Sequence, residues 1–209
     1  GLERYALPYR EAGYAVLAFD YRHFGESEGE PRQLIWIPYQ LEDWKAAIRY
    51  ARDLKEIDPE KIALWGTSFS GGHVIVTAAE DNRIACVVAH CPGVDGHASG
   101  EMFVKSVGIG HGLRVLMHGQ RDFMRSLFGL SAHKIPIAGK PGTIACLNTQ
   151  DAYDRYREQV PDTFINEVCA RILVRGDKYR PVKQANRVRC PVLLQACEKD
   201  TIIPLSAVE

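Results

Sequence analysis

The chain lacks several features that mark particular classes of protein. It has no net charge, since 26 Lys and Arg residues balance 26 Asp and Glu residues, and so carries no electrostatic footprint for nucleic acid or an anionic membrane. No apolar run approaches the roughly 18 residues of a membrane span, and no basic-then-apolar leader opens the chain. The six cysteines form no CxxC pair and have no metal-ligand spacing, which favours free, mostly buried thiols in a reducing cytoplasm. We therefore expect a cytoplasmic protein with no nucleic-acid or membrane partner and no metal or cofactor.

The composition is that of a globular domain, with 46% apolar and 25% charged residues, and its apolar pattern alternates between strand and helix. A helix is predicted from Leu2 to Glu11, and helical spacing of apolar residues predicts another from Pro38 to Leu54. Continuous apolar runs predict buried strands at Tyr14–Asp20, Lys61–Trp65, Arg83–His90 and Cys190–Ala196. This alternation predicts an α/β fold with a mostly parallel sheet and helices on both faces.

A serine stands at the turn after the second of these strands. The strand Lys61–Trp65 runs into Gly66-Thr67-Ser68-Phe69-Ser70-Gly71-Gly72, and a buried helix is predicted to follow. Strand, glycine turn and helix with a serine at the apex form a nucleophile elbow, in which the positions two before and two after the serine must be small. Gly66 satisfies this, while Ser70 replaces the usual second glycine. The alternatives are an ordinary glycine-rich turn and a phosphate-binding loop, although the latter needs a Lys before Ser or Thr.

Five stretches together resemble one family of enzymes. They are D-Y-R-x-x-G-x-S-x-G at Asp20–Gly29, the elbow W-G-T-S-F-S-G-G-H, C-P-G-V-D-G at Cys91–Gly96, N-E-V-x-A-R…Y-R-P at Asn166–Pro181 and C-P-V-L-L-Q-x-x-E-K-D at Cys190–Asp200. In this order they resemble the α/β-hydrolase superfamily, and within it serine esterases and dipeptidyl-peptidase-like hydrolases. The resemblance implies an α/β-hydrolase fold with an inserted helical cap and a Ser-Asp-His triad in that chain order.

Carried over to this sequence, the resemblance assigns three roles. Ser68 is the expected nucleophile, Asp200 the triad acid, and the backbone N–H of Phe69 one oxyanion donor. A serine hydroxyl attacks only when a histidine accepts its proton, and the acid orients that histidine. Asp95 is the alternative acid, although its position in Gly93–Gly96 also suits turn chemistry. For Asp200 the alternative is an exposed turn aspartate.

No triad histidine is expected within these 209 residues, because none follows Asp200. His73 and His90 are interpreted as packing or hydrogen-bonding residues, and His111 and His118 precede glycines on the wrong side of the elbow. The oxyanion loop and its strand would precede Gly1, so we expect an incomplete sheet truncated at both ends. In such a sheet, Tyr14–Asp20 and the elbow strand either stay apart or pair directly.

The predicted domains are a partial hydrolase core at 1–97 and 188–209 and a helical cap at 98–187. The cap is mainly helical by pattern, with one helix expected from about Thr163 to Val174 and no strong strand. Six apolar residues of the cap either line an acyl pocket or pack cap helices together: Met102, Phe103, Leu113, Leu116, Phe123 and Phe128.

The predicted function is hydrolysis of a carboxylic ester or thioester of a small molecule through an acyl-serine on Ser68. The alternatives are a peptidase-like serine hydrolase and a non-catalytic, truncated hydrolase-fold protein that only binds a ligand. We expect these 209 residues alone to be inactive, because Ser68 then has no base.

Overall fold

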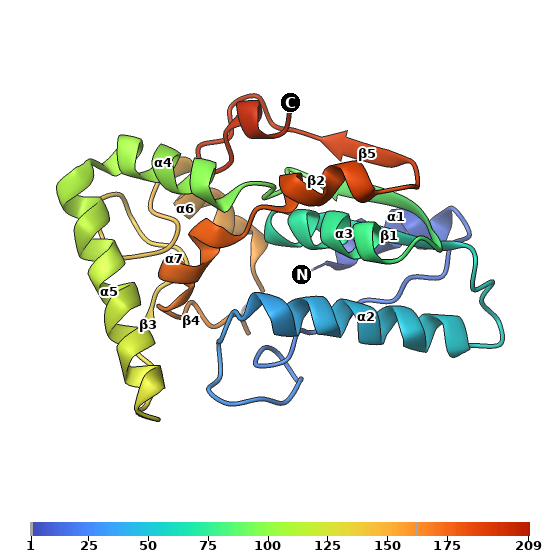
Figure 1. The fold of residues 1–209 in the computed structure, drawn as a ribbon, viewed down its shortest axis with the longest axis horizontal. Coiled ribbons are helices and arrows are strands. Elements are labelled where there is room, and N and C mark those ends of the chain that lie inside the picture. Colours follow the sequence, from blue (N-terminus) through green and yellow to red (C-terminus); the bar gives the residue numbers. More distant parts are fainter. Residues whose placement is uncertain (1, 162) are drawn as a thin grey trace.

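A computed structural model describes residues 2–161 and 163–209 and shows a small sheet with helices around it (Figure 1). The α-helices are α1 Glu3–Glu11, α2 Ile37–Asp53, α3 Phe69–Glu80, α4 Gly96–Val107, α5 Ile109–Leu127, α6 Gln150–Gln159 and α7 Ile172–Arg175. The strands are β1 Ile62–Thr67, β2 Ile84–His90, β3 Lys134–Ile135, β4 Val168–Cys169 and β5 Val192–Gln195. Short 3-10 helices are η1 Gly176–Lys178, η2 Pro181–Arg187 and η3 Leu205–Ala207.

The main sheet is parallel and has the order β1-β2-β5. Trp65 of β1 pairs with Val88 of β2, and Val88 pairs in turn with Leu193 of β5. Because all three strands point the same way, their carboxyl ends meet at one edge, which is where open α/β sheets bind ligands. The predictions of strands at Lys61–Trp65, Arg83–His90 and Cys190–Ala196 are confirmed, and so is the parallel α/β architecture.

Helices cover both faces of this sheet. On one face Leu64 and Val87 contact Val74 and Ile75 of α3 in the main apolar core, which Ile48 of α2 completes. Trp65 projects from the opposite face, since neighbouring strand residues alternate. There it packs against Tyr5 of α1, with ring centroids 4.7 Å apart. The predictions of helices at Leu2–Glu11 and Pro38–Leu54 are therefore confirmed, and each helix contributes to a face of the sheet.

The prediction of a strand at Tyr14–Asp20 is wrong. Within the described residues this segment carries no ladder hydrogen bonds, and β1 is paired only with β2. Tyr14, Val16 and Leu17 are 65%, 45% and 47% exposed, so the apolar run is not buried on both faces. An apolar run becomes a strand only when a neighbouring strand accepts its backbone hydrogen bonds. Of the two arrangements expected for this segment and the elbow strand, the structure has the one in which they stay apart.

The region between β2 and β5 is mainly helical, as predicted, but its last helix is misplaced. The helix expected from Thr163 to Val174 is wrong: β4 lies within it, and only Ile172–Arg175 forms α7. The Cys169 N–H donates to Gln33 O at 2.9 Å and the Ala170 N–H to His133 O at 2.9 Å. These amides are bound to distant segments, so they are not available for helical hydrogen bonds. The two short strands β3 and β4 pair antiparallel.

A buried ion pair fastens α5 to the segment after β4. The Asp122 side chain is fully buried and accepts hydrogen bonds from the Arg171 backbone N–H at 2.9 Å and from its Nε at 2.7 Å. It also accepts the His133 N–H at 2.7 Å. Burial acts to raise the Asp122 pKa, but these bonds from Arg171 and His133 outweigh it and lower the pKa.

The helix α5 exposes many apolar side chains. Its exposed apolar residues are Ile109, Leu113, Leu116, Met117, Met124 and Leu127, and Phe128 follows the helix. Arg114, Gln120 and Arg121 of α5 are exposed as well. Within the described residues, no helix has the length and apolar character needed to cross a membrane.

Candidate active site

The elbow serine lies where the sequence places it, between β1 and α3. Ser68 follows Thr67 directly, has φ 53° and ψ −119°, and precedes the first residue of α3. A positive φ is rare for a residue with a Cβ and costs of the order of 1–3 kcal/mol. Ser68 is also exposed. The prediction of a strained strand-to-helix turn at Ser68 is confirmed, and its side chain faces solvent.

Close backbone contacts explain the small residues around Ser68. A Cβ on Gly66 would lie 2.4 Å from the carbonyl oxygen of Ser70, so only glycine fits there. A Cβ on Gly71 would lie 2.7 Å from Pro92 Cα, and one on Gly72 would lie 2.4 Å from the Gly93 oxygen. The first turn of α3 therefore packs directly on the Pro92–Gly93 segment. Gly71 and Gly72 allow this close approach, which the second glycine of a common elbow usually allows.

Ser70, the departure from the common elbow pattern, has its own polar partner. Its Oγ hydrogen-bonds to the Tyr21 hydroxyl at 2.7 Å, and Trp44 Nε1 donates to that hydroxyl at 2.7 Å. Burial raises the pKa of Tyr21 to about 12, so the phenol stays protonated. These two hydrogen bonds join the Asp20–Gly29 loop and α2 to the elbow.

Hydrogen bonds through the Ser68 backbone fix the elbow to the end of β2. The Ser68 N–H donates to His90 O at 2.9 Å, and its carbonyl accepts the N–H groups of Gly71 at 3.0 Å and Gly93 at 2.8 Å. The Phe69 N–H belongs to the first residue of α3, where no intrahelical acceptor exists. Such an N–H suits an oxyanion donor. Its orientation toward a cleft stays a prediction.

Asp200 lies at the same edge of the sheet as Ser68. It follows the carboxyl end of β5, although β2 separates β5 from the elbow strand. Its Oδ1 accepts the N–H groups of Ile202 at 2.8 Å and Ile203 at 2.9 Å, which fixes the carboxylate in a turn. Asp200 therefore follows the carboxyl end of a strand, as predicted, but this strand is not next to the elbow strand. Its role as the triad acid stays a prediction.

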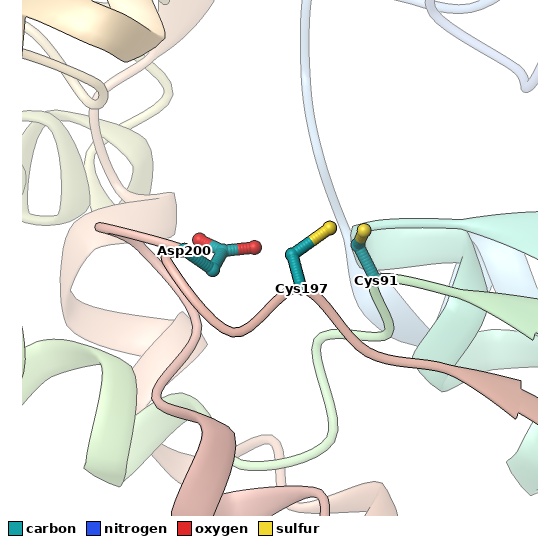
Figure 2. Close-up of side chains that lie close together, drawn as sticks. All are labelled: Cys91, Cys197 and Asp200. Carbon is teal, nitrogen blue, oxygen red and sulfur yellow. The ribbon is translucent and has the colours of Figure 1, made fainter.

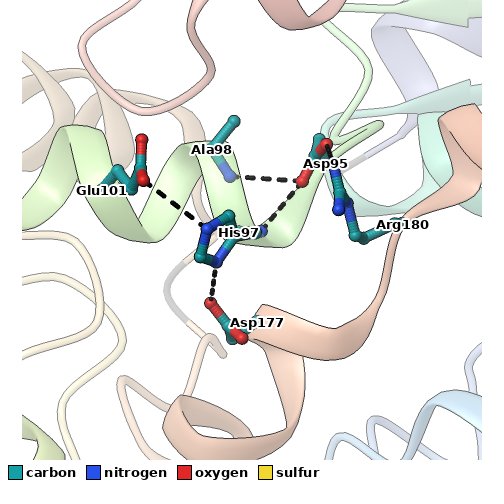
Figure 3. Close-up of polar contacts among 6 residues, drawn as sticks. All are labelled: Asp95, His97, Ala98, Glu101, Asp177 and Arg180. Carbon is teal, nitrogen blue, oxygen red and sulfur yellow. Dashed lines mark hydrogen bonds and ion pairs between the residues drawn. The ribbon is translucent and has the colours of Figure 1, made fainter.

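Asp95, the alternative acid, is engaged elsewhere. Its Oδ1 caps α4 by accepting the N–H groups of His97 at 3.0 Å and Ala98 at 3.2 Å, and its Oδ2 pairs with Arg180 at 2.6 Å (Figure 3). Burial acts to raise its pKa, but the hydrogen bond from Arg180 and those from the helix N-terminus together lower it. Asp95 therefore caps a helix and does not take the turn role predicted for it, and its ion pair joins α4 to Arg180.

None of the seven histidines, all of which are described, is hydrogen-bonded to Ser68 Oγ. His73 is fully buried, with Nδ1 2.6 Å from the Tyr179 hydroxyl and Nε2 2.9 Å from Gln40 Oε1. Since Gln40 Oε1 can only accept, Nε2 carries a proton. Burial lowers the pKa of His73 to about 3, so the ring is neutral and Nδ1 is left to accept from the Tyr179 hydroxyl. His90 Nδ1 lies 3.0 Å from Thr67 Oγ1. The interpretation of His73 and His90 as hydrogen-bonding residues is confirmed.

The remaining histidines also lie away from the elbow serine's hydroxyl. His97 bonds to Asp177 at 2.9 Å, His111 to Asn148 at 3.1 Å, and His118 to His133 at 2.8 Å. His23 is buried and stacks on Tyr39, with ring centroids 5.9 Å apart.

Two open hollows in the described structure do not include Ser68 in their linings. One, of about 350 Å³, is lined by Ser106, Val107, His111, Pro141, Gly142, Asn148, Thr149 and Gln150. The other, of about 320 Å³, is lined by Lys45, Ile48, Arg49, Arg52, Thr77, Glu80 and Asp81. Of the six apolar residues predicted for a pocket or for cap packing, Leu113, Leu116 and Phe128 are 56%, 40% and 73% exposed. These three side chains therefore neither line one of these hollows nor pack fully between cap helices.

A cluster of possible metal ligands was missed by the reading of cysteine spacing. The Sγ atoms of Cys91 and Cys197 and a carboxylate oxygen of Asp200 lie within 4.8 Å of one another (Figure 2). Burial, together with the neighbouring Cys197 and Asp200, raises the pKa of Cys91 to about 12. All six thiols are free, but only Cys169 is buried, four are half-buried and Cys197 is exposed, so the prediction of mostly buried thiols is wrong. Only the pairing of β2 with β5 brings these residues together.

Comparison with known proteins decides the family. The family model described as X-Pro dipeptidyl-peptidase (S15 family) matches residues 3–203. The chain belongs to the S15 family. A curated relative of this S15-family chain, the quorum-quenching protein AidA of Acinetobacter baumannii, is 42% identical over 205 residues, 97% of this chain and 66% of AidA. The thiohydrolase aneE of Aspergillus aculeatus is 40% identical over 94 residues, 45% of this chain and 30% of aneE.

Solved structures confirm the fold of this S15-family chain. The crystal structure of the alpha/beta hydrolase GrgF from Penicillium sp. sh18 superposes with a TM-score of 0.78 at 23% identity, over 99% of this chain and 69% of GrgF. The predicted α/β-hydrolase fold is therefore confirmed. The chain spans about two thirds of the length of AidA.

Proposed function

We propose that this chain supplies the nucleophile and the acid of a serine hydrolase that cleaves the ester or thioester of a small molecule. The observation that carries the proposal is Ser68 itself, an exposed serine with φ 53° and ψ −119° between a parallel strand and a helix. No ordinary packing role needs a strained, solvent-facing serine at that place. The names of AidA, a quorum-quenching protein, and of the thiohydrolase aneE support a small-molecule substrate.

In the proposed mechanism, Ser68 Oγ gives its proton to the histidine and attacks the carbonyl carbon of the substrate. The tetrahedral intermediate then breaks its bond to the alcohol or thiol, which leaves with that proton, and water hydrolyses the resulting acyl-serine. The Phe69 N–H donates to the oxyanion that develops, and the N-terminal end of α3 adds its positive dipole there. Asp200 orients and charge-stabilises the histidine that accepts the serine proton. The seven histidines of this chain are engaged elsewhere or not bonded to Ser68, so the mechanism takes its base from outside these 209 residues.

Peptidase chemistry is the second candidate, and the family description favours it. Acyl transfer to water from an ester, a thioester or a prolyl amide begins with the same attack by Ser68. The difference lies in the pocket that holds the substrate.

The six free thiols agree with a reducing compartment, and on this ground we propose the cytoplasm.

The nucleophile is tested by fluorophosphonate labelling of the protein as its gene encodes it. We expect one label per chain, on the peptide that contains Ser68, and complete loss of labelling in Ser68→Ala. Ser106→Ala, a serine of α4, serves as the matched control and should label like the natural protein. Labelling that persists in Ser68→Ala would show that another residue is the nucleophile.

The substrate class is tested with three chromogenic probes, each followed by the absorbance that its own leaving group produces. They are a short-chain aryl ester, an acyl thioester and an X-Pro aryl amide. We expect Ser68-dependent turnover of the ester and thioester to exceed that of the amide by at least about tenfold in kcat/KM, a difference of about 1.4 kcal/mol in transition-state binding. Faster cleavage of the amide would favour the peptidase.

A further inference from the structure

Three side chains that can bind metal meet beside the proposed catalytic acid. Cys91 directly follows β2, and Cys197 and Asp200 follow β5. The Cys91 N–H donates to Gln195 O at 2.7 Å, which holds the ends of these two strands together. Figure 2 shows the Asp200 carboxylate directed toward Cys197, with Cys91 beyond it. The donors therefore converge because of the sheet register.

The donor set fits zinc better than a harder cation. Two thiolates and a carboxylate are ligands that Zn²⁺ accepts, whereas Mg²⁺ and Ca²⁺ prefer oxygen donors only. Two sulfur atoms bound tetrahedrally to one Zn²⁺ lie roughly 3.8 Å apart, given a Zn–S distance of about 2.3 Å. The donor atoms here already lie within 4.8 Å of one another, so small side-chain rotations would complete the site. Cys197 is exposed, which gives an ion a path to the cluster.

Asp200 links this cluster to the proposed active site. Its Oδ1 is occupied by the N–H groups of Ile202 and Ile203. Oδ2 is then the oxygen available either to the imidazole of the triad or to a metal. A zinc ion on Oδ2 would compete with the histidine for the same lone pairs and add positive charge where an imidazolium must form during acyl transfer.

We propose that Cys91, Cys197 and Asp200 bind one zinc ion, and that the bound ion inhibits hydrolysis by withdrawing Asp200 from the triad. The binding stands on the geometry of the cluster alone. The inhibition rests on the proposed function of Ser68 and Asp200.

Binding is tested on the reduced, metal-free protein as its gene encodes it, with Co²⁺ as a spectroscopic probe and Zn²⁺ as its competitor. We expect one Co²⁺ per chain, a near-ultraviolet thiolate-to-cobalt charge-transfer band, and displacement of Co²⁺ by Zn²⁺. Cys197→Ser and Cys91→Ser should each weaken binding at least about tenfold. The matched control Cys86→Ser, a half-buried cysteine of β2, should bind like the natural protein. No charge-transfer band, or a band that persists in the Cys91→Ser/Cys197→Ser double variant, would overturn the site.

Inhibition is tested by fluorophosphonate labelling with and without saturating Zn²⁺. We expect labelling of the natural protein and of Cys86→Ser to slow more than about tenfold with Zn²⁺, and the slowing to be mostly lost in Cys197→Ser. Equal slowing in Cys197→Ser and the natural protein would place the inhibitory ion elsewhere and overturn the regulatory role. If no labelling occurs even without Zn²⁺, the proposed hydrolase function fails, whereas the cobalt titration still decides the metal site.

Discussion

At the scale of single residues, the elbow depends on the absence of a side chain at position 66. Gly66 faces the Ser70 carbonyl oxygen, and a Cβ there would lie 2.4 Å from it. Backbone atoms on both sides of the contact belong to a strand and a helix, so neither can move alone. The strain at Ser68 is held in place by this contact and by the bonds of its own backbone to His90 and Gly93.

Gly66→Ala is expected to lower the free energy of unfolding by about 1–3 kcal/mol, the usual cost of overpacking. Displacement of Ser68 should also reduce fluorophosphonate labelling. Urea unfolding followed by circular dichroism measures the first effect. Gly110→Ala is the matched control, because nothing lies within 4 Å of a Cβ at Gly110, which lies in α5. It should leave stability unchanged or raise it by up to about 1 kcal/mol. Equal stability of the two variants would contradict the contact at Gly66.

His73 should make stability depend on pH. Its folded pKa is about 3, well below the value of about 6.5 in an unfolded chain. Below pH 6.5 the unfolded chain therefore binds a proton that the folded chain does not, and stability falls as the pH drops. At pH 5 this loss amounts to about 2 kcal/mol. His73→Gln should reduce the fall in unfolding free energy between pH 7.5 and 5 by about that amount.

His97 is the matched control, with a shift of opposite sign. The hydrogen bond and charge of Asp177 raise its pKa, so its contribution to stability is complete below pH 6.5 and is lost as the pH rises through its folded pKa. His97→Gln should therefore steepen the fall toward pH 5. Urea titrations at the two pH values measure both variants, and a His73→Gln profile identical to that of the natural protein would contradict the buried, neutral imidazole.

At the scale of elements, one ion pair determines how α5 joins the rest of the region between β2 and β5. Removing the charge of Asp122 would leave the Arg171 guanidinium, whose side chain is only 11% exposed, without its partner. Asp122→Asn is expected to cost about 3–5 kcal/mol. Asp154→Asn, an exposed aspartate of α6, should stay within about 0.5 kcal/mol of the natural protein. Denaturant midpoints of the two variants and the natural protein give the comparison, and a midpoint for Asp122→Asn near that of Asp154→Asn would show that the pair contributes little.

The elements that could be predicted from the sequence are those that form because of residues close to them in the chain. The turn at Ser68 follows from Gly66 and its neighbours, and α2 follows from its own apolar spacing. Tyr14–Asp20 failed because a strand needs a partner, which no local pattern supplies. The helix predicted at Thr163–Val174 failed because Cys169 and Ala170 donate to distant carbonyls. Cys91 and Cys197 lie about a hundred residues apart, so only the sheet topology reveals that they meet with Asp200.

At the scale of the whole molecule, the 209 residues bury only part of their apolar strand surface. Val192, Leu193 and Leu194 of β5 are 40%, 54% and 44% exposed, and Tyr14–Asp20 is unpaired. Surfaces of this kind lower the stability of a domain that exposes them.

The 209 residues expressed alone are therefore expected to unfold in a broad transition. They should not hydrolyse a short-chain aryl ester above the level of their own Ser68→Ala variant, because no described histidine is bonded to Ser68. The protein as its gene encodes it, assayed in parallel, supplies the comparison. Cooperative unfolding of the 209 residues together with Ser68-dependent turnover would mean that one of the seven histidines serves as the base after all.

The order of the sheet also has a consequence in time. β2 and β5 are neighbours in space, but about a hundred residues separate them in the chain. A ribosome that adds roughly 5–20 residues per second needs about 5–20 s to make that interval. During that time the nascent chain already contains the elbow serine, whereas β5, Cys197 and Asp200 have not been synthesised. The edge of β2 that later pairs with β5 is therefore open. The proposed acid therefore joins the sheet late in synthesis, and until then the growing chain carries the nucleophile without it.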